Sequence, residues 1–235
     1  MPARETCENQ IVNDVLSGLP LFAVLDNDAG AALRGAMKHE HFARGDVVFD
    51  EGDQGDKLYA VIEGKIKIAR TAADGRESLQ TVVGPGEMFG ELSLFDPRPR
   101  TAGAVAITDS VLASLAHDAL RPWINQHSDV AVQLLQALVQ RLRRTNDVMA
   151  DLVFSDVPSR VAKTLLNLAE RFGQHSSEGI HVAHDLTQEE LAQLVGASRE
   201  TVNKALADFS GRGWIRIESR AVVIKDLDGL SRRAK

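Results

Sequence analysis

Two short segments of the sequence combine residue types that bind phosphates or nucleic acids. The first runs Phe89-Gly-Glu-Leu-Ser and is followed by Arg100 and Thr101. Glycine lets the backbone approach a phosphate, N–H groups at the start of a short helical turn point at its oxygens, and arginine neutralises its charge. Glu91 can accept a hydrogen bond from a ribose hydroxyl. The candidate phosphate-site residues are Gly90, Glu91, Leu92, Ser93, Arg100 and Thr101.

The second segment is typical of two short helices joined by a tight turn. Thr187 and Glu190 form a capping box, Gly196 turns the chain, and Ser198 caps the second helix. The second helix has an apolar face, formed by Val202, Ala205, Leu206 and Phe209, and a polar face that could meet base edges in a major groove. The predicted DNA contacts are Thr187, Gln188, Ser198, Arg199, Glu200, Thr201, Asn203 and Lys204. A plain amphipathic helix pair with a solvated outer face is the alternative.

A long helical segment separates these two candidate sites. After Pro122 the period becomes helical and stays so to about Leu152, with a narrow seam at Leu135, Leu138, Leu142, Thr145, Met149 and Leu152. This spacing predicts a two-stranded coiled coil and a homodimer, and the alternative is a helix lying on its own domain. Thr145 and Asn146 place polar groups in the seam, where they either fix the register or face a ligand.

The segments that flank the long helix predict two different domains. From Val47 to Leu115, alternating apolar residues and frequent glycine turns indicate a half-buried antiparallel sheet in a sandwich or barrel, with a helix around Asp28–Lys38. Beyond a hinge at Phe154–Asp156 we expect a helix to Phe172, a polar loop over Gln174–Gly179, a short strand, the helix pair and a terminal hairpin. The hairpin makes the helix-turn-helix a winged one.

The predicted fold class is therefore α+β, a jelly-roll-like β-roll with a long dimerisation helix followed by a winged helix-turn-helix domain. The predicted domains are a sensor over 1–121, a dimerisation helix over 122–153 and a DNA-binding domain over 154–235.

Composition agrees with a soluble two-domain protein. The chain has 235 residues, 44% of them hydrophobic and 26% charged, with a formal net charge of −6. The acidic excess lies in residues 1–155, so that 156–235 is nearly neutral and can present a basic face. No apolar run is long enough for a membrane span or a signal peptide, so we expect no membrane association and a cytoplasmic location.

Metal and enzyme chemistry find little support in the sequence. A single cysteine, Cys7, excludes an internal disulfide and a cysteine-rich metal site. His39 and His41 resemble part of a cupin metal motif, but a carboxylate and a later histidine in register are missing; we expect both of them, His117 and His127 at the surface. No nucleophile with a base is evident, so we predict a protein that is not an enzyme and holds no metal.

The run Val195-Gly-Ala-Ser-Arg-Glu-Thr-Val-Asn203 resembles the DNA-reading motif of the cyclic-AMP receptor branch of the Crp/Fnr transcription-regulator family. Gly45, Glu51-Gly52-Asp53, Gly55-Asp56 and Gly64 are similar to the glycine pattern of the family's cyclic-nucleotide-binding β-roll, and Arg141-Leu-Arg-Arg-Thr-Asn146 is most similar to its actinobacterial members.

The resemblance implies a cyclic-AMP-responsive regulator. Cyclic AMP would be the allosteric effector, and double-stranded DNA with palindromic GTGA-like half-sites, RNA polymerase and a second copy of the chain would be the partners. Thr145 and Asn146 would meet the purine, one of them across the dimer seam. Asn146 and Thr101 depart from the best-known pattern, which leaves cyclic GMP open. A constitutive DNA-binding regulator, one that answers another ligand, and a cupin-type enzyme with a fused DNA-binding domain are the rival interpretations.

Overall fold

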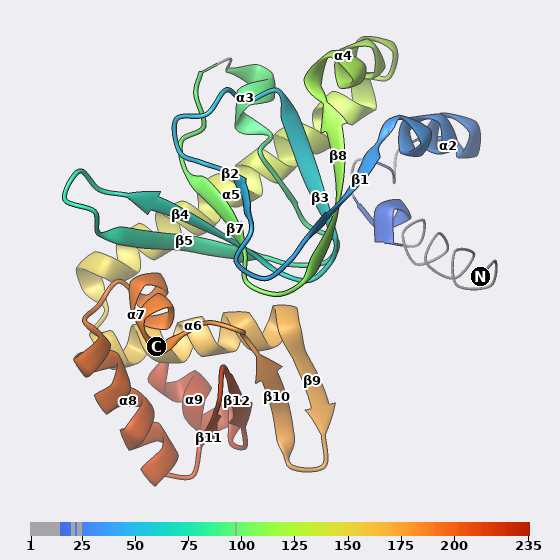
Figure 1. Ribbon diagram of the computed structural model, residues 1–235. Helices are drawn as coiled ribbons and strands as arrows, with labels where there is room; N and C mark the ends of the chain where they lie inside the picture. Colours follow the sequence, from blue (N-terminus) through green and yellow to red (C-terminus); the bar gives the residue numbers. More distant parts are fainter. Residues whose placement is uncertain (1–14, 20–21, 23–24, 97) are drawn as a thin grey trace. The chain divides into compact units, whose positions relative to one another are not determined.

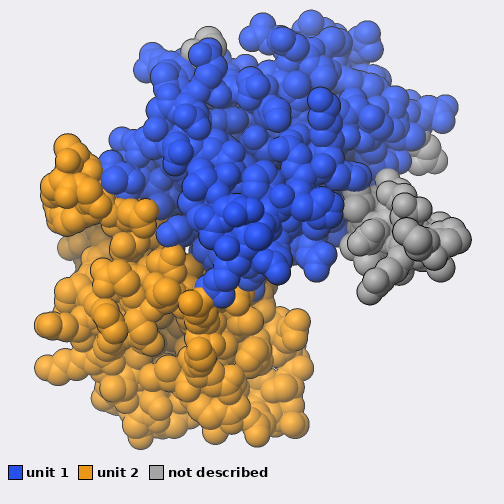
Figure 2. Space-filling view, viewed as in Figure 1, with its two compact units in different colours: residues 1–71, 82–143 blue, residues 72–81, 144–235 orange. Residues whose placement is uncertain are grey.

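The computed structural model describes residues 15–19, 22, 25–96 and 98–235, so Cys7 lies outside the described residues. The chain divides into two compact units, residues 1–71 with 82–143 and residues 72–81 with 144–235 (Figure 2). Within the described ranges, no helix combines the length and the apolar character needed to cross a membrane.

Two four-stranded sheets form the β-roll predicted from the turn spacing (Figure 1). Their strand orders are β1-β8-β3-β6 and β2-β7-β4-β5. The strands are β1 (Lys38–Phe42), β2 (Val47–Phe49), β3 (Lys57–Glu63), β4 (Ile66–Thr71), β5 (Glu77–Val83), β6 (Met88–Phe89), β7 (Gly103–Ala106) and β8 (Ser110–Ala116). Gly64, at φ +85°, makes the tight connection between β3 and β4, where a Cβ atom would lie 2.4 Å from the Asp109 carbonyl oxygen.

Strand β3 is buried on both faces, although the alternating pattern predicted a half-buried sheet. Leu58, Ala60 and Ile62 face one apolar cluster, which also contains residues of the flanking helices. Tyr59 and Val61 face a second cluster inside the roll. β3 lies between β8 and β6, so both of its edges are hydrogen-bonded, and the two clusters cover its two faces. Single-strand periodicity does not reveal such central strands.

The helices that accompany the roll include α2 (Asn27–Ala36), α3 (Leu92–Phe95), α4 (His117–Gln126) and α5 (Ser128–Phe154). The helical region begins earlier than predicted, because Pro122 lies inside α4 and does not start a helix. A break at His127 then separates α4 from α5. The 27-residue helix α5 spans the boundary between the two units.

The second unit combines helices with a four-stranded sheet of order β11-β12-β10-β9 (Figure 1). Its elements are α6 (Val157–Phe172), β9 (Gly173–Ser176), β10 (Gly179–Ala183), α7 (Gln188–Val195), α8 (Arg199–Gly211), β11 (Ile215–Glu218), β12 (Ala221–Ile224) and α9 (Leu227–Arg233). The predicted wing hairpin is confirmed, with Ser219 and Arg220 as its two-residue loop. The predicted polar loop over Gln174–Gly179 is wrong, because its first part is the edge strand β9, which carries no apolar alternation.

Candidate functional site

Arg100 is the centre of the site in the first unit. Its side chain is buried, with 6% exposure. Nη1 donates to the Gly90 carbonyl oxygen at 2.8 Å and to Ser93 Oγ at 3.0 Å, and Nη2 donates to the Lys57 carbonyl oxygen at 2.6 Å. The guanidinium also lies 4.2 Å from the centre of the Phe49 ring. Arg100 is thus anchored by neutral groups, and among the described residues no carboxylate forms an ion pair with it.

Two glycines allow this close packing. Gly90 has φ +82°, and a Cβ atom there would lie 2.9 Å from Arg100 Nη1 and 3.2 Å from the Lys57 carbonyl oxygen. A Cβ atom on Gly55 would lie 2.2 Å from Ser93 Oγ. The segment Phe89–Ser93 and the chain around Gly55 therefore close over Arg100 only because both positions lack a side chain.

Glu91 meets α5. Arg141 Nη1 donates to Glu91 Oε1 at 2.7 Å, whereas Glu91 Oε2 is buried without a hydrogen-bond partner. Arg100 Nε is likewise buried and unpartnered. A donor on a buried cation and an acceptor on a buried carboxylate both lack partners in this one site. That pair fits a ligand that carries an anionic group and a hydroxyl.

The electrostatics of the site follow from burial. Burial lowers the pKa of the Arg100 guanidinium, and the charges of Tyr59, Asp56 and Glu91 oppose this effect. His117, predicted at the surface, is in fact buried, and its Nε2 has no hydrogen-bond partner. Burial and the charge of Arg100 lower its pKa. His117 begins α4 directly after a core strand, which places it inside.

Of the other three histidines predicted at the surface, two are exposed and one is half-buried. His39 and His41 are exposed, as predicted, and His127 is half-buried, with its ring centre 5.5 Å from that of Trp123. In the part of the chain that the structure describes, no group of three or more His, Cys, Asp and Glu side chains is arranged to hold a metal ion.

The remaining sensor residues lie around the Arg100 site or along α5. Ser93 also donates to the Gly90 carbonyl oxygen, while Leu92 and Thr101 are exposed. Thr145 and Asn146 are exposed on α5 in the second unit, and their approach to a purine stays a prediction.

The predicted seam of α5 is largely exposed. The exposed fractions are 55% for Leu135, 59% for Leu142, 62% for Met149 and 50% for Leu152. Leu138 is half-buried, whereas Val132 and Val139 are each 47% exposed. An apolar row of this length on one helix face is typical of a protein–protein contact.

The helix pair α7–α8 has the predicted local geometry. The Thr187–Glu190 capping box is present, and Gly196 ends α7 in the left-handed conformation. Ser198 caps α8 and accepts a hydrogen bond from the Thr201 N–H at 3.3 Å. The predicted apolar face of α8 is buried.

The opposite face of the helix pair is open to solvent. Thr187, Ser198, Arg199, Glu200, Thr201 and Lys204 are exposed, and Gln188 and Asn203 are half-buried. Asn203 Oδ1 and Gln188 Oε1 are buried without hydrogen-bond partners. The structure therefore brings the predicted DNA-contacting residues to the start of α7 and to the first two turns of α8.

Arg160 fixes the turn between α7 and α8, a role that sequence reasoning missed. Its guanidinium donates to the carbonyl oxygens of Val195, Gly196 and Ser155, at 3.1, 3.1 and 2.7 Å. A Cβ atom on Gly196 would lie 2.7 Å from Leu152 Cδ2. The end of α5 therefore contacts the helix-turn-helix turn directly.

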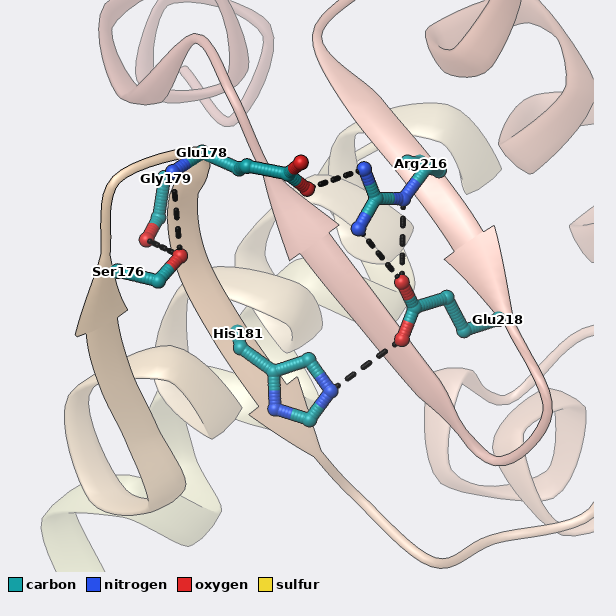
Figure 3. Close-up of polar contacts among 6 residues, drawn as sticks. All are labelled: Ser176, Glu178, Gly179, His181, Arg216 and Glu218. Atoms are coloured by element: carbon teal, nitrogen blue, oxygen red, sulfur yellow. Dashed lines mark hydrogen bonds and ion pairs between the residues drawn. The ribbon is translucent and has the colours of Figure 1, made fainter.

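The outer face of the small sheet carries a polar network (Figure 3). Arg216 donates from Nε and Nη2 to Glu218 Oε1, at 3.1 and 2.8 Å, and from Nη1 to Glu178. His181 Nε2 lies 3.3 Å from the other Glu218 oxygen. The network crosses β12 and covers Val223, which is 2% exposed.

Both the region around Arg100 and the helix-turn-helix region match known protein families. Residues 39–127 match the cyclic nucleotide-binding domain family, and residues 159–233 match the Crp-like helix-turn-helix domain family. The "CRP-like cAMP-activated global transcriptional regulator" of Mycobacterium tuberculosis is 54% identical over 95% of this chain and 100% of its own length. The chain belongs to the Crp/Fnr family of transcription regulators.

Solved structures of other bacterial regulators share the fold. A CRP-family transcriptional regulator from Thermus thermophilus has a TM-score of 0.70 and 30% identity, covering 83% of this chain and 96% of its own. The c-di-GMP-responsive global regulator CLP of Xanthomonas campestris has a TM-score of 0.70 and 28% identity, covering 85% and 99%. Membership of this family confirms the predictions of an α+β fold and of a regulator that is not an enzyme.

Several residues that contact Arg100 or Glu91 could not be predicted from the sequence around them. The ring of Phe49 and the carbonyl of Lys57 reach Arg100 from other strands, and Arg141 reaches Glu91 from a helix 50 residues away. Gly55 is the exception. A conformationally permissive residue beside a turn indicates a close backbone approach, and the sequence carries that signal.

Proposed function

We propose that this protein is a cyclic-AMP-activated transcription regulator that binds DNA as a homodimer. The observation that carries the proposal is the buried Arg100 guanidinium, which has one unpartnered donor and no ion-paired carboxylate among the described residues. Burying a charge without an opposite charge is costly, and the phosphate of a cyclic nucleotide would supply one. Glu91 Oε2 would accept the ribose hydroxyl.

Cyclic AMP is the ligand that we favour. The Mycobacterium tuberculosis relative is named as cAMP-activated, and Thr145 and Asn146 offer a hydroxyl and an amide to a purine edge. The Xanthomonas relative is c-di-GMP-responsive, so cyclic GMP and c-di-GMP serve as competing ligands in binding assays. Cyclic AMP would order the Arg100 site and α5, and would shift the paired DNA-binding domains about Phe154–Asp156 towards a DNA-competent spacing.

Each of the three predicted domains would have one role in this regulation. Residues 1–121 would sense the nucleotide, residues 122–153 would hold the dimer, and residues 154–235 would bind DNA and act with RNA polymerase in the cytoplasm. Two-fold symmetry places the recognition helices in successive major grooves about 34 Å apart, which requires a palindrome with GTGA-like half-sites.

Replacing Arg199 by alanine tests the DNA half of this proposal. Arg199 lies exposed in the first turn of α8, where a bidentate contact to guanine is expected, so its loss should cost about 1 to 3 kcal/mol per half-site and relax specificity at one base pair. Mobility shifts on a palindrome and its single-base variants, at two salt concentrations and with cyclic AMP present, measure both effects.

Arg212→Ala is the matched control. Arg212 lies at the other end of α8 and pairs with Asp208 at 2.8 Å, so its loss should leave base preference unchanged. If Arg199→Ala retained the wild-type preference at every base pair, the assignment of α8 to the major groove would be wrong. Lys204→Ala should weaken binding to all sequences alike if Lys204 contacts only phosphate.

A further inference from the structure

His117 is a buried titratable residue beside the Arg100 site, and the proposed function does not use it. Its side chain is 8% exposed, and its Nε2 atom is buried without a hydrogen-bond partner in the described part of the chain. The His117 N–H donates to the Asp56 carbonyl oxygen at 2.9 Å, and Arg100 Nη2 donates to the next carbonyl oxygen, that of Lys57, at 2.6 Å. His117 and Arg100 are therefore fixed to consecutive peptide groups at the start of β3.

Burial and the neighbouring charges set the protonation state of His117. The charged groups that act on its ring, in order of their effect, are Arg100, Asp56, Arg121 and Asp118. Lys57, on the adjoining strand β3, has its ammonium group engaged by Glu40 at 3.4 Å. Burial has the largest effect on the pKa of His117 and the charge of Arg100 the second largest, and both lower it. The imidazole is therefore neutral at pH 7 in the free protein.

A phosphate bound to Arg100 would oppose the second of these effects. The phosphodiester of a cyclic nucleotide carries one negative charge, which offsets the positive charge of the guanidinium. Protonated His117 would then meet less repulsion, although burial would still oppose its charge. No hydrogen bond to Nε2 holds the ring in its neutral form. The nucleotide and the proton would therefore favour each other's binding, because such coupling is reciprocal.

We propose that His117 takes up a proton from solvent when a cyclic nucleotide binds at Arg100, so that the sensor responds to acidity as well as to the nucleotide. The inference rests on the proposed function and adds a form of regulation to the same site. Since the bound protein holds the proton more tightly than the free protein, nucleotide affinity rises as the pH falls through the titration range of His117.

Calorimetric titration of the full-length protein with cyclic AMP, in buffers of different ionisation enthalpy at pH ~6, measures this uptake directly. The slope of the observed enthalpy against the ionisation enthalpy gives the number of protons bound. We expect uptake on the order of half a proton per site in the wild type, and none in His117→Gln, which keeps a polar side chain but does not titrate. His39→Gln, a change at an exposed histidine, is the matched control and should keep the uptake.

The affinity itself should follow the same linkage. A difference of one pKa unit between the free and the bound protein corresponds to a 10-fold change in affinity over the whole titration, so we expect cyclic AMP to bind ~3- to 10-fold more tightly at about pH 5.5 than at about pH 8. This dependence should be lost in His117→Gln and retained in His39→Gln.

A measurement on the wild type keeps the inference testable if His117→Gln does not fold. The midpoint of the His117 ring signals, followed by NMR over a pH series, should move to higher pH when cyclic AMP saturates the protein. An unmoved midpoint would overturn the inference, as would binding of cyclic AMP without proton uptake, or uptake that persists in folded His117→Gln. Failure of the wild type to bind cyclic AMP at any of these pH values would instead refute the proposed function itself.

Discussion

Replacing Arg100 by alanine is expected to abolish useful cyclic AMP binding, with a loss of about 2 to 3 kcal/mol or roughly 30- to 150-fold in affinity. The variant removes the buried cation that would meet the phosphate. It also removes the Arg100 donor to the Lys57 carbonyl oxygen and one of the two donors to the Gly90 carbonyl oxygen, so we expect the free energy of unfolding to fall by about 1 to 3 kcal/mol as well. Isothermal titration calorimetry gives the affinity, and urea unfolding gives the stability.

Arg98→Ala is the matched control for this prediction. Arg98 precedes Arg100 by two residues, is 81% exposed and pairs with Asp96 at 3.1 Å on the surface. Its loss should change neither affinity nor stability appreciably, because exposed ion pairs contribute little. Unchanged nucleotide affinity in Arg100→Ala would show that the phosphate binds elsewhere.

Replacing Leu142 by aspartate is expected to convert the dimer to monomers. Leu142 is 59% exposed in a single chain, and the dimer would place two aspartates in an apolar seam. DNA affinity should fall with the loss of one half-site, and sedimentation velocity at micromolar concentration should show the monomer. Leu142 is a better probe than Leu138, because Leu138 is half-buried and its replacement would also disturb its own chain.

Gln140→Asp, a change at an exposed polar residue of the same helix, should leave the dimer intact. A wild type that sediments as a monomer at micromolar concentration would contradict the coiled-coil interpretation, and with it the shared purine contacts of Thr145 and Asn146.

The sequence predicted local features well where one segment contained the whole signal. The capping box at Thr187, the turn at Gly196 and the cap at Ser198 each depend on neighbours within four residues, and all are present. The apolar face of α8 followed from its period in the same way.

Features that depend on distant segments were either not predicted from the sequence or predicted wrongly. His117 is polar and was expected outside, but its burial follows from the packing of α4 after β8. Arg141 and Arg160 look like surface charges in sequence, and only the fold brings them to Glu91 and to the helix-turn-helix turn. Long side chains with several donors acquire such partners through tertiary structure, which spacing along the chain does not encode.

We propose that a nucleotide held by Arg100 controls DNA binding by α8. Its most direct test is an anisotropy titration of the wild-type protein against a palindromic GTGA duplex, at fixed salt, with and without saturating cyclic AMP. We predict that cyclic AMP tightens DNA binding by at least ~5-fold, the lower end of usual allosteric coupling, and that Arg100→Ala removes the difference. Equal DNA affinity with and without cyclic AMP, in a protein shown by calorimetry to bind the nucleotide, would show that the nucleotide does not control DNA binding.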